Sequence, residues 1–348
     1  MQIRKLVIAV IILVLLGGSA LAREPIYLTL AEAEQMAMEN SVSLRISRLA
    51  LDEAQFNYRQ ADAAMIMRPS PVMLLQAQAG LDIAKQNHLM AQDQLRLTVQ
   101  TDFYNVLKMQ NVVQIAQEGL ESAKRHEDIA VKQYDVGTAT RLDVIKATRS
   151  VLNAQASLSQ ARHGLELSQM KFRQNLGVSL DAPIFAKSVP LKIEPVEIDL
   201  EEDITFALAN RDEIKQLNVA VEVARKNVEL AENDYTPVLQ LEQAKINLAK
   251  MEAQLEQVKE LLVLDIRQNF SAIIDARERI TVHQKGIEEA EEMIRLSELS
   301  YEASMITSND LADAQMAVLS AKNEFVAAVF DYRLSLANYY NAVTRALR

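Results

Sequence analysis

Tyr134-Asp-Val-Gly-Thr-Ala-Thr-Arg-Leu-Asp143 is the stretch that decides the fold, because a second version, Tyr301-Glu-Ala-Ser-Met-Ile-Thr-Ser-Asn-Asp310, follows 167 positions later. Apolar positions of the two copies recur at the same offset: Val99 with Ile266, Phe103 with Phe270, and Val106 with Ile273. Solenoid repeats have much shorter periods, of ~20–50 residues. The chain is therefore interpreted as a duplicated half-domain whose two copies lie side by side.

Each copy is predicted to contain one long helix between two shorter ones. Residues 71–137 and 237–304 contain no internal Pro and keep apolar residues at helical spacing. At ~1.5 Å per residue, each run makes a rod of roughly 100 Å. A shorter helix precedes each rod, near 31–67 in the first copy, and must stop before the next Pro. The capping signals Thr140-x-x-Asp143 and Thr307-x-x-Asp310 start the returning helices.

The N-terminus has the pattern of a secretory signal peptide. Arg4 and Lys5 supply a positive start, residues 6–16 are apolar, and residues 20–22 read Ala-Leu-Ala, a small-residue cleavage site. We therefore expect export to the periplasm or cell envelope. A retained membrane anchor is the open alternative, although the run is shorter than the ~18–20 residues that span a bilayer. The absence of Cys excludes disulfides, thiolate metal sites and a lipid on cysteine.

Composition favours a helical protein that faces water. Charged residues make up 24% of the chain, with only 8 Gly, 7 Pro and no Trp. The net charge of −10 argues against nucleic acid and anionic lipid as partners. The predicted organisation is a signal peptide (1–22), a first helical repeat (23–177), a Pro-containing linker (178–197) and a second helical repeat (198–348).

The rods must pack on neighbours, because helices in proteins are stabilised mainly by burying an apolar face. The first returning helix carries small residues at alternating spacings of three and four, a seam that permits close helix approach. The seam consists of Ala147, Ser150, Ala154, Ser157, Ala161, Gly164 and Ser168. The predicted fold class is all-α, with duplicated long antiparallel helical hairpins that form coiled-coil columns. The two short helices of a copy, stacked end to end, would make a column as long as one rod.

The doubled tip motif, Tyr27-Leu-Thr-Leu-Ala-Glu-Ala33 and the duplication together resemble the TolC-like outer-membrane efflux family over nearly the whole mature chain. The resemblance implies a homotrimer whose helices build an α-helical tunnel. It also implies two partners, a periplasmic adaptor of the membrane-fusion type and an inner-membrane pump. The implied function is the exit duct of a tripartite efflux or type I secretion system.

The resemblance also implies roles for residues at the tips. Adaptor docking falls on the two turns: Gly137, Thr138 and Ala139, with Ser304, Met305 and Ile306. Asp310 and Asp313 match an acidic ring around the tunnel aperture, while Tyr301, Asp143 and Arg141 match a lock that keeps it shut. Capping is the alternative for Asp143 and Asp310, and a solvated surface acid is the alternative for Asp313. Ile306 stands where relatives can carry a basic residue, so the lock is expected to differ in detail.

One departure concerns the membrane. Members of the family insert two β-strands between the short and long helices of each repeat, but here the breaks are only 68–71 and 235–237. We therefore expect no β-barrel, helical apices, and no direct bilayer spanning by the mature chain. The apolar residues around the breaks are interpreted either as a staple of the hairpin apex or as an adaptable surface that meets a partner: Met65, Ile66, Met67, Val72, Met73, Leu74, Leu75, Val238 and Leu239.

Nothing in the sequence indicates catalysis, a cofactor or a metal. His88, His126, His163 and His283 have no metal-ligand spacing and are interpreted as solvated. Glycines form no phosphate-binding loop, and the acidic run 288–292 favours a wet helix face. The chain is therefore predicted not to be an enzyme. Besides an exit duct, a non-conducting coiled-coil spacer of the cell envelope stays open as an alternative.

Overall fold

The computed structural model describes residues 25–67, 71–193, 196–303 and 305–344. The predicted signal peptide lies outside these residues. Two long helices, α4 (Pro71–Asp135) and α8 (Val238–Glu302), span the length of the molecule, and each has 65 residues. The prediction of two equally long rods is confirmed. No helix within the described ranges combines the length and apolarity needed to cross a bilayer.

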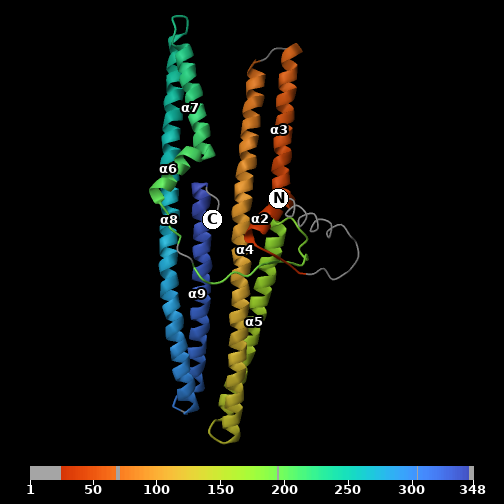
Figure 1. The fold of residues 1–348 in the computed structure, drawn as a ribbon, viewed down its shortest axis with the longest axis vertical. Helices are drawn as coiled ribbons and strands as arrows, with labels where there is room; N and C mark the ends of the chain where they lie inside the picture. Colours follow the sequence, from red (N-terminus) through yellow and green to blue (C-terminus); the bar gives the residue numbers. More distant parts are fainter. Residues whose placement is uncertain (1–24, 68–70, 194–195, 304, 345–348) are drawn as a thin grey trace, which may run out of the picture.

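Shorter helices stack end to end beside each long helix (Figure 1). α3 (Val42–Met67) and α5 (Arg141–Asn175) pack on opposite halves of α4. In the second copy, α7 (Asp212–Ala231) and α9 (Ser308–Val343) pack on α8 in the same way. α9 also contacts α4, which joins the two copies. The predicted columns and all-α class are confirmed.

The helix expected over 31–67 is a pair of helices, so that prediction was wrong in one respect. α2 (Leu30–Asn40) ends at Ser41, whose backbone is extended (φ −61°, ψ 128°), and α3 starts at the next residue. In the second copy α6 (Leu200–Asn210) ends at Arg211 with nearly the same angles (φ −62°, ψ 131°). The break leaves room for the end of α5, because the α-carbon of Gly177 packs directly on the carbonyl of Asn40.

A small parallel sheet lies at mid-height and was missed by the sequence analysis. β1 (Ile26–Leu28) pairs with β2 (Ile184–Ala186), with Tyr27 opposite Phe185. The buried guanidinium of Arg173 holds the loop before β2, since it donates to the carbonyls of Leu180 (2.8 Å) and Ile184 (3.2 Å). Residues 184–186, placed in the linker by the sequence analysis, are therefore part of the ordered core.

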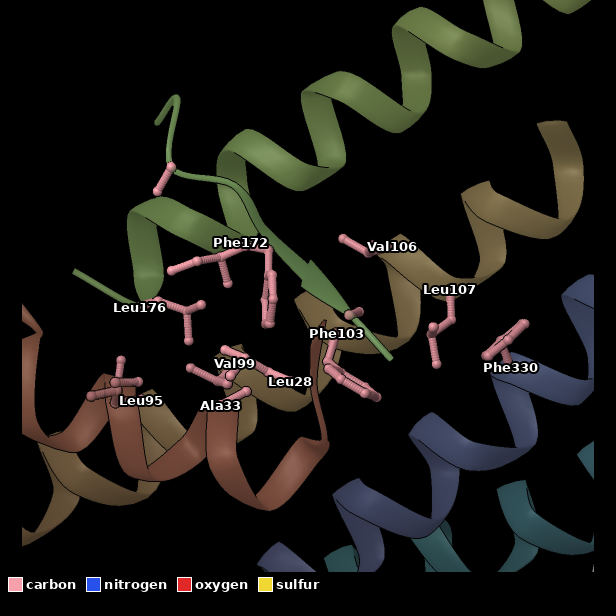
Figure 2. Packing of buried hydrophobic residues seen from close by; sticks show 14 of the residues in the cluster. Leu28, Ala33, Leu95, Val99, Phe103, Val106, Leu107, Phe172, Leu176 and Phe330 are labelled. Carbon is pink, nitrogen blue, oxygen red and sulfur yellow. The ribbon is translucent and has the colours of Figure 1, made fainter. Parts of the chain in front are cut away.

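The apolar core of the first copy gathers around this sheet (Figure 2). Phe103 of α4 packs edge-on against Phe172 of α5, with ring centroids 6.0 Å apart. The second copy has an equivalent core, whose most buried large residues include Ile214, Ile266, Val329, Tyr339 and Val343. The repeat pairs Val99 with Ile266 and Val106 with Ile273 are buried in both copies. The duplication thus places two similar cores at the middle of the molecule.

Candidate functional site at the hairpin tips

The two tips lie at the same end of the molecule (Figure 1). In the first tip Gly137 has a positive φ of 80°, which a residue with a Cβ adopts only with strain. Thr138 and Ala139 both donate backbone hydrogen bonds to the carbonyl of Gln133, at 2.9 and 3.1 Å, and so close the turn. Gly137 and Thr138 are exposed and Ala139 is half-buried.

The second tip is built without glycine. The N–H of Met305 donates to the carbonyl of Ser300 at 2.8 Å, while the Met305 side chain is 79% exposed. Ile306 is half-buried. Ser304, a predicted docking residue, lies outside the described residues. The first tip turns on a glycine and the second does not, so the two tips have different backbones, and each exposes an apolar side chain, Val136 (74%) or Met305 (79%).

Matching capping boxes start the returning helices. Asp143 accepts hydrogen bonds from the Thr140 backbone N–H (2.9 Å) and hydroxyl (2.7 Å). Asp310 accepts the same two bonds from Thr307, at 2.8 and 2.7 Å. The bond from each threonine hydroxyl is the main reason why the pKa of each carboxyl is lowered. The capping alternative for both aspartates is confirmed, and their aperture and lock roles stay predictions.

The residues of the predicted lock belong to different hairpins. Tyr301, in the last turn of α8, is buried and its pKa is raised, first by burial and then by the charge of Asp143 on α5. The chain thus brings Tyr301 and Asp143 near one another. Arg141 is exposed in the first turn of α5. Asp313 is exposed on α9, nearly one turn after Asp310, so both predicted ring residues face solvent at the same helix end.

A groove of about 950 Å³ separates the two hairpins above the tips. One wall is formed by α5 and includes Ala147, Ser150 and Ala154 from the small-residue seam. Residues of α9 form the opposite wall, among them Asp313 and Met316. The narrow small-residue wall leaves room for a side chain or a helix between the hairpins. Tyr301 also lines the groove, so one residue of the predicted lock belongs to this site.

The base of the groove is where α4 and α9 touch. A Cβ on Gly119 would come within 2.8 Å of the side chain of Leu319, so the glycine permits this close contact. Lys322 of α9 reaches Glu118 of α4 at 3.0 Å and Glu291 of α8 at 3.9 Å. Lys322 therefore connects the two hairpins. We call Lys322, Glu118 and Glu291, with the histidine described next, the inter-hairpin clasp.

His126 of α4 completes the clasp, and its placement corrects the sequence analysis. It lies 3.3 Å from a carboxylate oxygen of Glu298 on α8 and forms a hydrogen bond with Gln315 on α9. Burial, and then the charge of Arg125, lower the pKa of His126. The interpretation as solvated was wrong for His126 and also for His88, which is buried and hydrogen-bonded to Ser47 at 2.6 Å.

The fold and tips can be compared with known proteins. The sequence model described as "Outer membrane efflux protein" matches residues 72–178, which include the first tip and its two helices. The resemblance to the TolC-like outer membrane efflux family is confirmed. Outer membrane protein TolC of Escherichia coli (strain K12) is 20% identical over 308 residues, covering 72% of this chain and 62% of TolC.

Two further comparisons agree with this resemblance. Alkaline protease secretion protein AprF of Pseudomonas aeruginosa is 20% identical over 285 residues, covering 69% of this chain and 59% of AprF. The chain thus spans about 60% of the length of these curated relatives. The solved structure of outer membrane protein VceC from Vibrio cholerae superimposes with a TM-score of 0.68 at 14% identity, covering 90% of this chain and 95% of VceC. The likeness shows a shared TolC-like fold.

Proposed function

We propose that this chain is the exit duct of a tripartite efflux or type I secretion system, and that it lies in the cell envelope. The observation that carries the proposal is the pair of hairpin tips with a groove between them at one end of a long helical body. A channel family and a relative named for protease secretion support a transport role over catalysis. The residue types at the tips supply turns, caps and a groove, which are features of a docking surface.

The duct is proposed to be a homotrimer. One chain exposes large apolar side chains along its short helices, including Ile46, Leu49 and Phe56 of α3 and Val219 and Val223 of α7. These side chains recur at helical spacing and would be covered by a neighbouring copy. A closed ring of subunits buries these apolar faces on every subunit, whereas a monomer leaves them exposed to water.

Docking of a membrane-fusion type adaptor is proposed at the tips. Thr138 and Met305 offer exposed side chains on either side of the groove, and the small-residue wall near Ala147 admits a helix at close range. An inner-membrane pump would deliver substrate to the duct through the adaptor. Asp310 and Asp313 are proposed to ring the aperture in the trimer, with Tyr301, Asp143 and Arg141 holding neighbouring coils together when it is closed.

Site-specific crosslinking tests the proposed docking at the tips. A photoreactive amino acid placed at Thr138 or Met305 is expected to capture an adaptor in living cells, whereas one at Tyr235, at the opposite end, is not. Light scattering of the processed protein is expected to give a trimer. A well-folded monomer at micromolar concentration would count strongly against a tunnel. A trimer whose tips capture nothing would favour the structural spacer.

A further inference from the structure

The end of the molecule opposite the tips carries a group of highly exposed apolar side chains. We call these two helix turns the apices: the end of α3 with the start of α4, and the segment between α7 and α8 (Figure 1). The exposed apolar residues of the apices are 78–97% accessible, with Met73 at 60%: Ile66, Met67, Met73, Tyr235, Val238 and Leu239. Isolated exposed apolar residues are ordinary on protein surfaces, but a group at one end indicates an interaction site.

Charge is depleted where these side chains lie. Of the 19 residues from Ala63 to Leu81, Arg68 alone is charged, in a chain that is 24% charged overall. The second apex retains Glu232 and Asp234 before Tyr235. Its turn is fixed, because the Tyr235 N–H donates to the Asn233 side chain at 2.9 Å. The first apex is thus nearly uncharged, and the second has an acidic side next to an apolar one.

The apolar residues do not form one stripe along a helix. Ile66 and Met67 are adjacent, as are Val238 and Leu239, so they point in directions about 100° apart around their helices. A protein groove, or a neighbouring copy in a ring, covers one face of a helix. Apolar side chains on several faces at the very end of a helix suit a medium that surrounds the end. A lipid layer is such a medium.

We propose that the two apices insert their exposed apolar side chains into the surface of a membrane of neutral lipids, without spanning it. Tyr235 suits the interface, where an aromatic ring is buried while its hydroxyl stays hydrated. The acidic residues beside Tyr235 keep the second apex shallow, so the first apex enters more deeply. The net charge of −10 disfavours anionic lipids, so binding depends on apolar contact rather than on charge.

The inference stands apart from the proposed duct, since it rests on the opposite end of the molecule. The chain lacks tryptophan, which permits a local probe. Single tryptophans are introduced as Met67→Trp, Val238→Trp and, at the first tip, Val136→Trp, where the native side chain is 74% exposed. The processed proteins are mixed with phosphatidylcholine vesicles whose acyl chains carry bromine. We expect strong quenching at position 67, weaker quenching at 238 and none at 136.

A second pair of variants tests the surface directly. Ile66→Asp combined with Val238→Asp alters exposed positions, so the fold is expected to persist, and binding to the vesicles should fall at least tenfold. The matched control, Val136→Asp combined with Met305→Asp, changes equally exposed residues at the tips and should bind as the parent does. Absent quenching at position 67, or equal quenching at both ends, would overturn the proposal. So would capture of an envelope protein by the apices without lipid binding, which would assign them to a protein partner.

Discussion

The hydroxyl of Tyr339 donates a hydrogen bond of 2.7 Å to a carboxylate oxygen of Asp203 inside the core of the second repeat. The equivalent positions in the first repeat are Phe172, 167 positions before Tyr339, and Ala33, which is the fourth residue of α2 as Asp203 is of α6. Both are fully buried and apolar. The first copy therefore has two apolar residues in its core at these positions, and the second copy joins α6 to α9 with a polar pair. The two substitutions that separate the copies compensate one another.

This pairing predicts a non-additive pair of mutations. Tyr339→Phe removes the donor and leaves a buried carboxylate oxygen short of a hydrogen bond, which is expected to lower the free energy of unfolding by about 1–3 kcal/mol. Adding Asp203→Ala recreates the apolar pair of the first repeat and should recover part of that loss. Urea denaturation of both single variants and the double variant gives the coupling energy. Strictly additive losses would contradict a direct interaction.

A second prediction concerns the glycine that ends α5. Gly177 has a φ of 72°, and a Cβ there would lie 2.2 Å from the carbonyl oxygen of Asn40. Gly177→Ala is therefore expected to destabilise the first repeat by roughly 2–4 kcal/mol, through backbone strain and displacement of α2. Gly80→Ala is the matched control, because a Cβ there meets nothing within 4 Å. It should leave stability unchanged or raise it by up to about 1 kcal/mol. Thermal unfolding compares the two.

A third prediction links the clasp to pH. Burial lowers the folded-state pKa of His126, so the neutral form of this histidine contributes to the stability of the folded state. This contribution is complete above the unfolded-state pKa of about 6.5 and is lost as the pH falls towards the folded-state value. His126→Gln keeps a hydrogen-bonding side chain without the titration. The loss of stability between about pH 7.5 and pH 5 should be smaller in this variant than in the parent.

The measurement of the pH dependence of unfolding needs a control variant at a second histidine. The charge of Arg125 adds to the effect of burial on the pKa of His126. His163→Gln, which removes an exposed histidine of α5, is measured beside His126→Gln as the matched control. If both variants behave alike, the acid sensitivity does not come from the clasp.

The proposed aperture leads to a fourth prediction. Asp310 and Asp313 of three subunits would place six carboxylates together, and such a group binds multivalent cations. Asp310→Asn combined with Asp313→Asn should abolish the binding of hexamminecobalt measured by calorimetry. Asparagine at position 310 can still cap α9, so the fold is expected to persist. Asp52→Asn with Asp82→Asn, far from the tips, is the control. Unchanged binding in the tip variant would rule out an acidic ring there.

Local signals explain which parts of the fold the sequence could predict. Pro71 and Pro237 mark the starts of the two long helices, and the Thr140 and Thr307 capping boxes mark the starts of the returning ones. These features act over a few residues, so they can be read without the fold. The tip turns and the caps of the candidate site were accessible for the same reason.

Long-range contacts explain what was missed. The break at Ser41 follows from the packing of Gly177 across the repeat, and no neighbouring residue signals it. The strands β1 and β2 are three residues each, too short to show a period of two. His126 looked solvated because its partner Gln315 is 189 positions away in the chain. Each error involves residues that only the folded chain brings together.

The parallel pair of β1 and β2 also sets an order of events during biogenesis. Ile26 follows closely on the predicted leader, yet its strand partner Ile184 emerges only after the whole first hairpin has crossed the export channel. Chain segments that pair over such a separation close late in folding. The start of the mature protein must therefore wait, unpaired, until more than half of the polypeptide has arrived.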